Sequence, residues 1–261
     1  MDLGINGKTA LVFGAAGGLG SAIALTLARE GANVVLADIN EEALAPISQE
    51  VEKSAAQVMC LTWDLADLSV IEKNISAIES RFGTVDILVN NTGGPPPTPA
   101  SGQNPALWVK SFKSMVLSVI SITDRVLPGM RQKKWGRIIT STSSGVISPI
   151  PNLGISNALR MSLVGWSKTL AREVGKDGIT TNVVLPGRIA TTRIAFLDEQ
   201  KAKREGRTVE EVAAESTASI PLGRYGNPAE YGAVVTFLAS EQAAYVTGSI
   251  VRIDGGLIAS V

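Results

Sequence analysis

The chain has 261 residues, a usual length for an α/β domain and enough to bury a large core without disulfides or metals. Its 24 Lys and Arg balance its 24 Asp and Glu, and a neutral chain is a poor candidate for binding nucleic acid or an anionic membrane. The absence of histidine and the single cysteine, Cys60, exclude His-based triads, imidazole-ligated metal sites and internal disulfides.

Short apolar runs alternate with longer segments of helical periodicity along the whole chain. Helical patterns occur, for example, at Gly20–Glu30 and Leu159–Glu173. Strands of nearly continuous hydrophobicity separated by helices predict a doubly wound α/β fold, with a parallel sheet covered on both faces. The expected strands are Thr9–Phe13, Asn33–Ala37, Gln57–Thr62, Ile87–Asn90, Arg137–Ser141, Thr180–Leu185 and Ser249–Ile253.

No repeat or linker divides residues 1–261, so we expect one domain. The atypical stretch is residues 193–220, rich in Lys, Arg and Glu, in which Thr208 is placed to cap a helix at Val209–Ala214. We expect a helical excursion here, either a surface insertion or a lid over a binding cleft. The N-terminus lacks the pattern of a signal peptide, and no 18-residue apolar run occurs, so we expect a cytoplasmic protein that does not span a membrane.

A glycine-rich loop follows the first expected strand and leads directly into a helix. In Gly14–Gly20 the residues Gly14, Gly18, Leu19 and Gly20 can bring the backbone close to a pyrophosphate at the positive helix N-terminus. Asp38 ends the next strand 18 residues after Gly20, where a carboxylate binds ribose hydroxyls and repels a 2′-phosphate. This pattern predicts NAD in preference to NADP, although Asp38 could instead cap the helix that follows.

Asp64 and Leu65 end the third strand, where they can meet an adenine ring or simply form a turn. Together with the loop, these residues resemble short-chain dehydrogenases/reductases from end to end, and most closely 3-oxoacyl-acyl-carrier-protein reductases. Further matching segments are Asn90–Gly93, Gly136–Thr140, Ser143, Trp166–Val174, Pro186–Thr191, Val246–Gly248 and Asp254–Gly256.

The resemblance implies a seven-stranded parallel sheet, a nicotinamide dinucleotide, a small carbonyl or alcohol substrate, and a homo-oligomer, either a dimer or a tetramer. It implies that Asn91 and Gly93 line the cofactor, and that Ile189 and Thr191, after the Pro186-Gly187 turn, hold the nicotinamide carboxamide. No metal is implied.

The catalytic pattern of the family is incomplete. The resemblance places the family's tyrosine at Ser156, its lysine at Arg160 and its asparagine at Met115, so that only Ser143 matches. A serine hydroxyl is a far weaker acid than tyrosine, and arginine stays protonated and cannot relay a proton. Arg160 can still bind the cofactor's ribose hydroxyls, a carboxylate or a developing oxyanion. Structural roles also remain open: Met115 in the core, Arg160 paired with a carboxylate, Ser156 in a helix cap or first turn, and Ser143 as a polar strand end.

Three functions follow from these residues. The first is an NAD(H)-dependent oxidoreductase in which Ser143, Ser156 and Arg160 form an atypical site. The second is a dinucleotide-binding module without chemistry, either a sensor or a supporting subunit. The third is a lyase similar to halohydrin dehalogenases, which ranks last because those enzymes lose the dinucleotide loop that Gly14–Gly20 preserves here.

Overall fold

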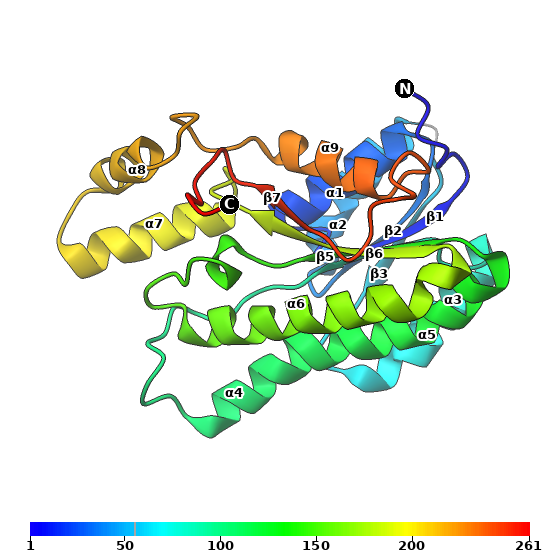
Figure 1. Ribbon diagram of the computed structural model, residues 1–261, viewed down its shortest axis with the longest axis horizontal. Coiled ribbons are helices and arrows are strands. Elements are labelled where there is room, and N and C mark those ends of the chain that lie inside the picture. The colour runs from blue at the N-terminus through cyan, green and yellow to red at the C-terminus, as the bar shows by residue number, and fades with distance from the viewer. Residues whose placement is uncertain (55) are drawn as a thin grey trace.

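Seven parallel strands form one sheet in the order β3-β2-β1-β4-β5-β6-β7 (Figure 1). The computed structural model describes residues 1–54 and 56–261. The strands are β1 (Thr9–Phe13), β2 (Asn33–Asp38), β3 (Val58–Thr62), β4 (Ile87–Asn91), β5 (Gly136–Ser141), β6 (Ile179–Pro186) and β7 (Ile250–Ile253). All seven expected strands are confirmed, with ends that shift by at most one residue, and so is the predicted fold class.

Helices cover both faces of the sheet. They are α1 (Gly18–Arg29), α2 (Glu41–Glu52), α3 (Ile71–Phe82), α4 (Pro105–Phe112), α5 (Ser118–Lys133), α6 (Gly154–Val174), α7 (Thr192–Glu205), α8 (Val209–Ala218) and α9 (Pro228–Leu238). One core lies between the sheet and α1, α2 and α9, and the other lies between the sheet and α3, α5 and α6. Successive strand residues alternate between the two cores, as a sheet buried on both faces requires.

The order in which strands are added to the sheet reverses between β1 and β4. Strands β2 and β3 extend from one side of β1, whereas β4 to β7 extend from the other. In open parallel sheets, ligands bind outside the carboxyl ends of the strands at such a switch point. The topology therefore places a binding site beside the loops after β1 and β4.

The residues from Pro105 to Lys133 form one long helical run that contains α4, a five-residue π-helical turn at Lys113–Leu117, and α5. By length and composition alone this run could cross a membrane. Its apolar residues Val119, Ile122 and Val126 are buried in the protein's own cores, as in a core helix of a globular domain.

The stretch 193–220, which we call the lid segment, contains most of α7 and all of α8. Figure 1 shows the two helices side by side, projecting beyond the sheet at the end of β6. Thr208 caps α8 through a capping box, in which its hydroxyl accepts from the Glu211 N–H and the Glu211 carboxylate accepts from the Thr208 N–H.

Candidate active site

A cleft of about 1290 Å³ opens at the carboxyl ends of the strands. Residues from the loops after β1 to β6 line it, together with the start of α6, the lid segment and the C-terminal residues Leu257 and Ile258. Every site residue expected from the sequence lines this cleft except Gly20. Segments as far apart as Gly14 and Thr191 therefore meet in one place.

The phosphate loop, Gly14–Gly20, needs glycine at three positions for three different reasons. Gly14 has φ +60°, and a Cβ there would lie 2.8 Å from the Asn91 carbonyl oxygen. A Cβ at Gly18 would lie 2.7 Å from the Thr191 methyl group, so the loop packs directly against the residues after β6. Gly20 lies behind the cleft surface, where a Cβ would come within 2.0 Å of the Gly14 carbonyl oxygen.

The start of α1 fits a pyrophosphate. Gly17 is the N-cap and has no side chain to accept from the first helical N–H groups, which belong to Gly18, Leu19 and Gly20. These donors and the positive end of the helix dipole suit an anion. The residues present thus fit the diphosphate of a dinucleotide.

Two carboxylates lie at the ends of β2 and β3. One oxygen of Asp38 accepts from the Ala16 N–H at 3.1 Å and the other from the Asn40 N–H at 3.0 Å. The N-cap of α2 is Asn40, so Asp38 fixes the phosphate loop rather than capping that helix. Asp64 is exposed and accepts from the backbone N–H two residues on, and Leu65 beside it is half-buried.

The opposite end of the cleft is formed by the residues after β4 and β6. The Asn91 side chain donates to the Phe13 carbonyl at 3.2 Å and so ties β4 to β1, and Gly93 follows it at the surface. Pro186 ends β6, and a Cβ at Gly187 would lie 2.5 Å from the Asp254 Cα, so the backbones are in close contact there.

After this turn, the side chain of Ile189 is buried, and Thr191 forms the N-cap of α7 by accepting from the Ile194 N–H. Both line the cleft, and Thr191 lies against the phosphate loop at Gly18.

Arg160 is almost fully buried at the cleft and donates hydrogen bonds to three backbone carbonyls. Its Nε donates to the Ser156 hydroxyl at 3.3 Å, Nη1 donates to the Ser141 carbonyl at 3.3 Å, and Nη2 donates to the carbonyls of Thr92 and Gly93 at 3.2 and 3.0 Å. Across residues 1–54 and 56–261, no carboxylate forms an ion pair with it.

Burial lowers the pKa of Arg160 to about 10, the neighbouring Arg193 contributes to the same shift, and Tyr231 opposes it. The guanidinium thus stays charged at neutral pH. It is a buried cation whose hydrogen-bond partners are neutral carbonyls and one hydroxyl, so it makes the potential in its own part of the cleft more positive.

Two serine hydroxyls line the cleft, and neither donates a hydrogen bond to another group among the described residues. Ser143 Oγ accepts from the Gly145 N–H at 3.0 Å, and Ser156 Oγ accepts from Arg160. Each hydroxyl therefore uses an acceptor position and retains its O–H as a donor. Ser156 lies in the first turn of α6, which is one of its two structural alternatives, the other being a helix cap. It stands four residues before Arg160, on the same face of the helix.

Met115 lies in the π-helical turn and is nearly fully buried among apolar residues of α5 and α6. Its role as a core residue is therefore supported, although it also contributes to the cleft lining. π-Turns are rare and often occur at functional sites, so the helix geometry marks this position even though its side chain carries no polar group.

None of the chain's three tyrosines lines the cleft. Tyr231 is fully buried on α9, shares a 2.8 Å hydrogen bond with the Ser141 hydroxyl, and has its pKa raised by burial. Tyr225 donates to the Asp198 carboxylate, and Tyr245 is fully exposed. No phenol is therefore placed to deliver a proton into the cleft.

Sequence reasoning missed Arg193, at the start of α7. Its Nη2 donates to the Pro95 carbonyl at 3.1 Å, and partial burial in the cleft lowers its pKa, although the residue as a whole remains exposed. The residues Gly94–Pro97, which we call the proline wall, line the cleft opposite. Arg193 follows directly after the Pro186–Thr191 motif, and that adjacency is the one signal that could have placed it here.

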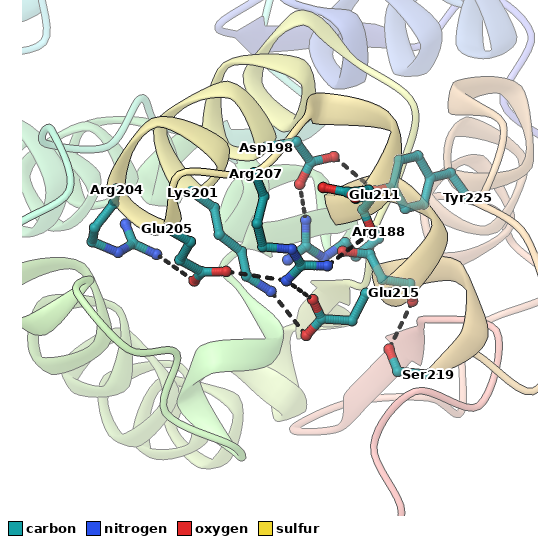
Figure 2. A network of polar contacts seen from close by, with 11 residues as sticks. Arg188, Asp198, Lys201, Arg204, Glu205, Arg207, Glu211, Glu215, Ser219 and Tyr225 are labelled. Atoms are coloured by element: carbon teal, nitrogen blue, oxygen red, sulfur yellow. Dashed lines mark hydrogen bonds and ion pairs between the residues drawn. The ribbon is translucent and has the colours of Figure 1, made fainter.

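An ionic network holds the lid segment together (Figure 2). Lys201 of α7 and Arg207 both pair with Glu215 of α8. At the base of α7, Arg188 donates to the buried Asp198 carboxylate at 2.5 Å, and Tyr225 donates to its other oxygen at 2.7 Å. The two helices therefore form one unit anchored to the loop after β6.

Comparison with known proteins places this site in a family. A family profile described as enoyl-(acyl carrier protein) reductase matches residues 14–258. The 3-oxoacyl-[acyl-carrier-protein] reductase of Escherichia coli K12 is 38% identical over 260 residues, covering 98% of this chain and 99% of that protein. The chain belongs to the short-chain dehydrogenase/reductase family. The resemblance seen in the motifs is thus confirmed.

Solved structures of short-chain dehydrogenases/reductases superpose closely on the chain. L-sorbose reductase of Gluconobacter frateurii, complexed with NADPH and L-sorbose, has a TM-score of 0.94 and 31% identity over all of both chains. NAD⁺-bound xylitol dehydrogenase has a TM-score of 0.90 and 26% identity, covering 97% of this chain and 99% of that one. Proteins of this one fold thus bind either dinucleotide, so the fold alone does not decide between NAD and NADP.

Proposed function

We propose that the chain is an NAD(H)-dependent oxidoreductase that interconverts a carbonyl and an alcohol at an atypical site. The observation that carries the proposal is one cleft that joins a pyrophosphate cradle to the Ser143 and Ser156 hydroxyls. A bound nicotinamide dinucleotide supplies or accepts the hydride in this chemistry. The family relatives named above, a ketoacyl reductase and two polyol or sugar enzymes, act on carbonyl–alcohol pairs by name.

The residues of the site would act mainly by electrostatic stabilisation. Ser143 and Ser156 donate to the substrate oxygen, and the charge of Arg160 strengthens the Ser156 donor, since it donates to that hydroxyl. Water supplies the proton through these hydroxyls, because no tyrosine lines the cleft. A missing positioned acid typically slows a reaction by about 10²–10⁴. We therefore expect slow turnover.

We propose NAD in preference to NADP from the charges at the β2–β3 end of the cleft. Asp38 and Asp64 line this end, followed by the exposed apolar Ile39, and no Lys or Arg lines it beside them within the described residues. A 2′-phosphate would face carboxylates and find no cation.

A titration with NADH and NADPH, monitored by the fluorescence of the nicotinamide, tests the proposal. We expect NADH to bind at least about tenfold more tightly than NADPH, since like charges a few ångströms apart cost about 1 kcal/mol or more even in water. Asp38→Asn removes the charge and keeps an acceptor for the Ala16 N–H, so it should narrow this ratio. Equal binding of both dinucleotides by the unaltered chain would refute the preference.

A second candidate is a dinucleotide-binding module without chemistry. It is favoured by the hydrogen bonds of Arg160, which hold backbone carbonyls, and by the lack of a tyrosine in the cleft. A panel of ketones, keto acids and alcohols with saturating NADH or NAD⁺ separates the two. Measurable turnover excludes the second candidate, whereas tight NADH binding without turnover on any member of the panel supports it.

We further propose a cytoplasmic homo-oligomer, a dimer or tetramer. Exposed apolar side chains occur on the helical run Pro105–Lys133 and on α6, at Val109, Phe112 and Met161. The edge strand β7 also exposes Ile250. A second copy would cover such patches. Light scattering coupled to size exclusion measures the mass, and a monomer at micromolar concentration would contradict this proposal.

A further inference from the structure

Two guanidinium groups converge on one point of the cleft, beside Gly94. A Cβ at Gly94 would lie 3.5 Å from the Arg193 Nη2 and 3.6 Å from the Arg160 Nη2. Arg160 comes from α6 and Arg193 from the start of α7, so two separate elements bring the charges together. Gly94 begins the proline wall, so the two cations lie at this part of the cleft.

The two cations have no acidic partner. Within residues 1–54 and 56–261, neither arginine forms an ion pair. Of the other cations that line the cleft, Arg188 pairs with Asp198, Lys201 with Glu215 and Arg204 with Glu205, whereas Lys110 on α4 forms no ion pair within the described residues. The other cations of the lid segment that line the cleft are thus compensated, and two uncompensated charges lie together beside Gly94.

This arrangement is unfavourable without a ligand. Burial disfavours the charged form of each group and lowers both pKa values, and repulsion from Arg193 lowers that of Arg160 further. The hydroxyl of Thr92, next to the carbonyl that Arg160 holds, is buried without a hydrogen-bond partner. An anion beside Gly94 would offset the repulsion between the two cations.

Arg193 also has donors to spare. A guanidinium carries five N–H bonds, and the bond to Pro95 uses one of them, whereas Arg160 makes four hydrogen bonds. Arg193 is exposed and its guanidinium rests 5.7 Å from the Phe196 ring, which leaves the outer donors accessible. Direct ligation is thus a role for Arg193, with Arg160 supplying charge from behind.

We propose that the substrate of this site carries an anionic group, a carboxylate or a phosphate, which Arg193 binds beside Gly94 under the positive potential of Arg160. The proposal rests on the proposed function, since it names the substrate class of the same site. Because Arg193 belongs to α7 and also bonds the proline wall, a bound anion would link the lid segment to the opposite side of the cleft. This favours a lid over a mere surface insertion for residues 193–220.

Isothermal titration with malonate, inorganic phosphate and neutral malonamide tests the proposal, each with and without saturating NADH. We expect at least one anion to bind while malonamide does not, and the affinity to fall with added NaCl. Malonate binding without phosphate binding assigns a carboxylate, and the reverse assigns a phosphate. Arg193→Ala should weaken binding about 10- to 100-fold, as expected for loss of charge-assisted hydrogen bonds.

Matched variants make the result specific. Arg193→Lys keeps the charge and should retain part of the affinity for the anion. Arg224→Ala removes an exposed arginine that pairs with Glu230 outside the cleft, and it should leave anion binding unchanged. Anion binding that is unchanged in Arg193→Ala, or no tighter than that of malonamide, would overturn the inference. The titration without NADH tests anion binding independently of the cofactor. Failure of the proposed function would appear separately, as an absence of NADH binding to the unaltered chain.

Discussion

Replacing Arg160 by methionine should leave the stability of the fold almost unchanged. Removal of one member of a buried ion pair usually destabilises a protein by about 3–5 kcal/mol, because the partner charge is left unpaired. Arg160 has no carboxylate partner, so its removal leaves only neutral groups behind: three carbonyls and the Ser156 hydroxyl. The substitution therefore loses four hydrogen bonds and removes the cost of burying a charge.

The lost contacts and the relieved charge are of similar size. Four hydrogen bonds at about 1 kcal/mol each amount to roughly 4 kcal/mol of lost stabilisation. Against this, burial lowers the pKa of Arg160 from 12.5 to about 10. At about 1.36 kcal/mol for each pKa unit, folding with this group charged costs about 3 kcal/mol at neutral pH. Arg160→Met removes that cost, and its side chain has a similar length.

Differential scanning calorimetry at pH 7 should therefore show a Tm within about 5 °C of the unaltered chain, since 1 kcal/mol shifts Tm by about 2–4 °C at this size. Arg137→Met is the matched control: Arg137 is buried on β5, donates to the carbonyls of Gly136, Gly178 and Ser240, and lies outside the cleft. Both variants should fold, but only Arg160→Met should weaken malonate binding. A fall in Tm of more than about 10 °C for Arg160→Met would refute this balance.

Three further changes test other parts of the site and fold. Gly20→Ala should lower the free energy of unfolding by about 1–3 kcal/mol and abolish NADH binding, because the added Cβ would clash with backbone atoms. The control Gly165→Ala should change neither, because nothing lies within 4 Å of a Cβ there. Calorimetry and NADH titration measure the two effects. Glu230 has its pKa lowered to about 2, first by an arginine hydrogen bond, so it contributes stability above pH 4.5 that is lost as the pH falls towards 2. Glu230→Gln should thus flatten the dependence of Tm on pH between 5 and 2, and an unchanged slope would contradict the cited shift. The double variant Ser156→Tyr/Arg160→Lys should raise turnover about 10²-fold or more in a carbonyl-reduction assay with NADH, and no gain would show that the pair alone does not limit the rate.

The sequence predicted the sheet well because its signals are local. Each strand is a continuous apolar run, and the glycines of the phosphate loop stand directly between β1 and α1. Thr208 could be placed as an N-cap because capping depends on residues three positions apart. The predicted strand ends differ by at most one residue, because the point at which a strand stops depends on its pairing with neighbouring strands, which the local sequence does not show.

The polar contacts of the site could not be predicted in the same way. The carbonyls that Arg160 holds come from residues 19 to 68 positions away, so a sequence pattern gives no sign of them. The alternative that paired Arg160 with a carboxylate is not found within the described residues, and Asn40 rather than Asp38 caps α2. Arg193 reaches the cleft only because α7 folds back towards the proline wall.

The family resemblance implies a lysine at the position of Arg160, and an arginine there changes what we expect the site to do. A lysine is a flexible point charge whose pKa shifts readily, whereas the planar guanidinium binds several acceptors at once in fixed directions. Here that geometry ties the ends of β4 and β5 to α6 and fixes the start of the proline wall. A cation held in this way cannot swing to relay a proton, but it keeps a steady positive potential beside Gly94. Such a site is better suited to binding a charge already present on the substrate than to delivering a proton, which is why slow protonation and anion recognition follow from the same residue.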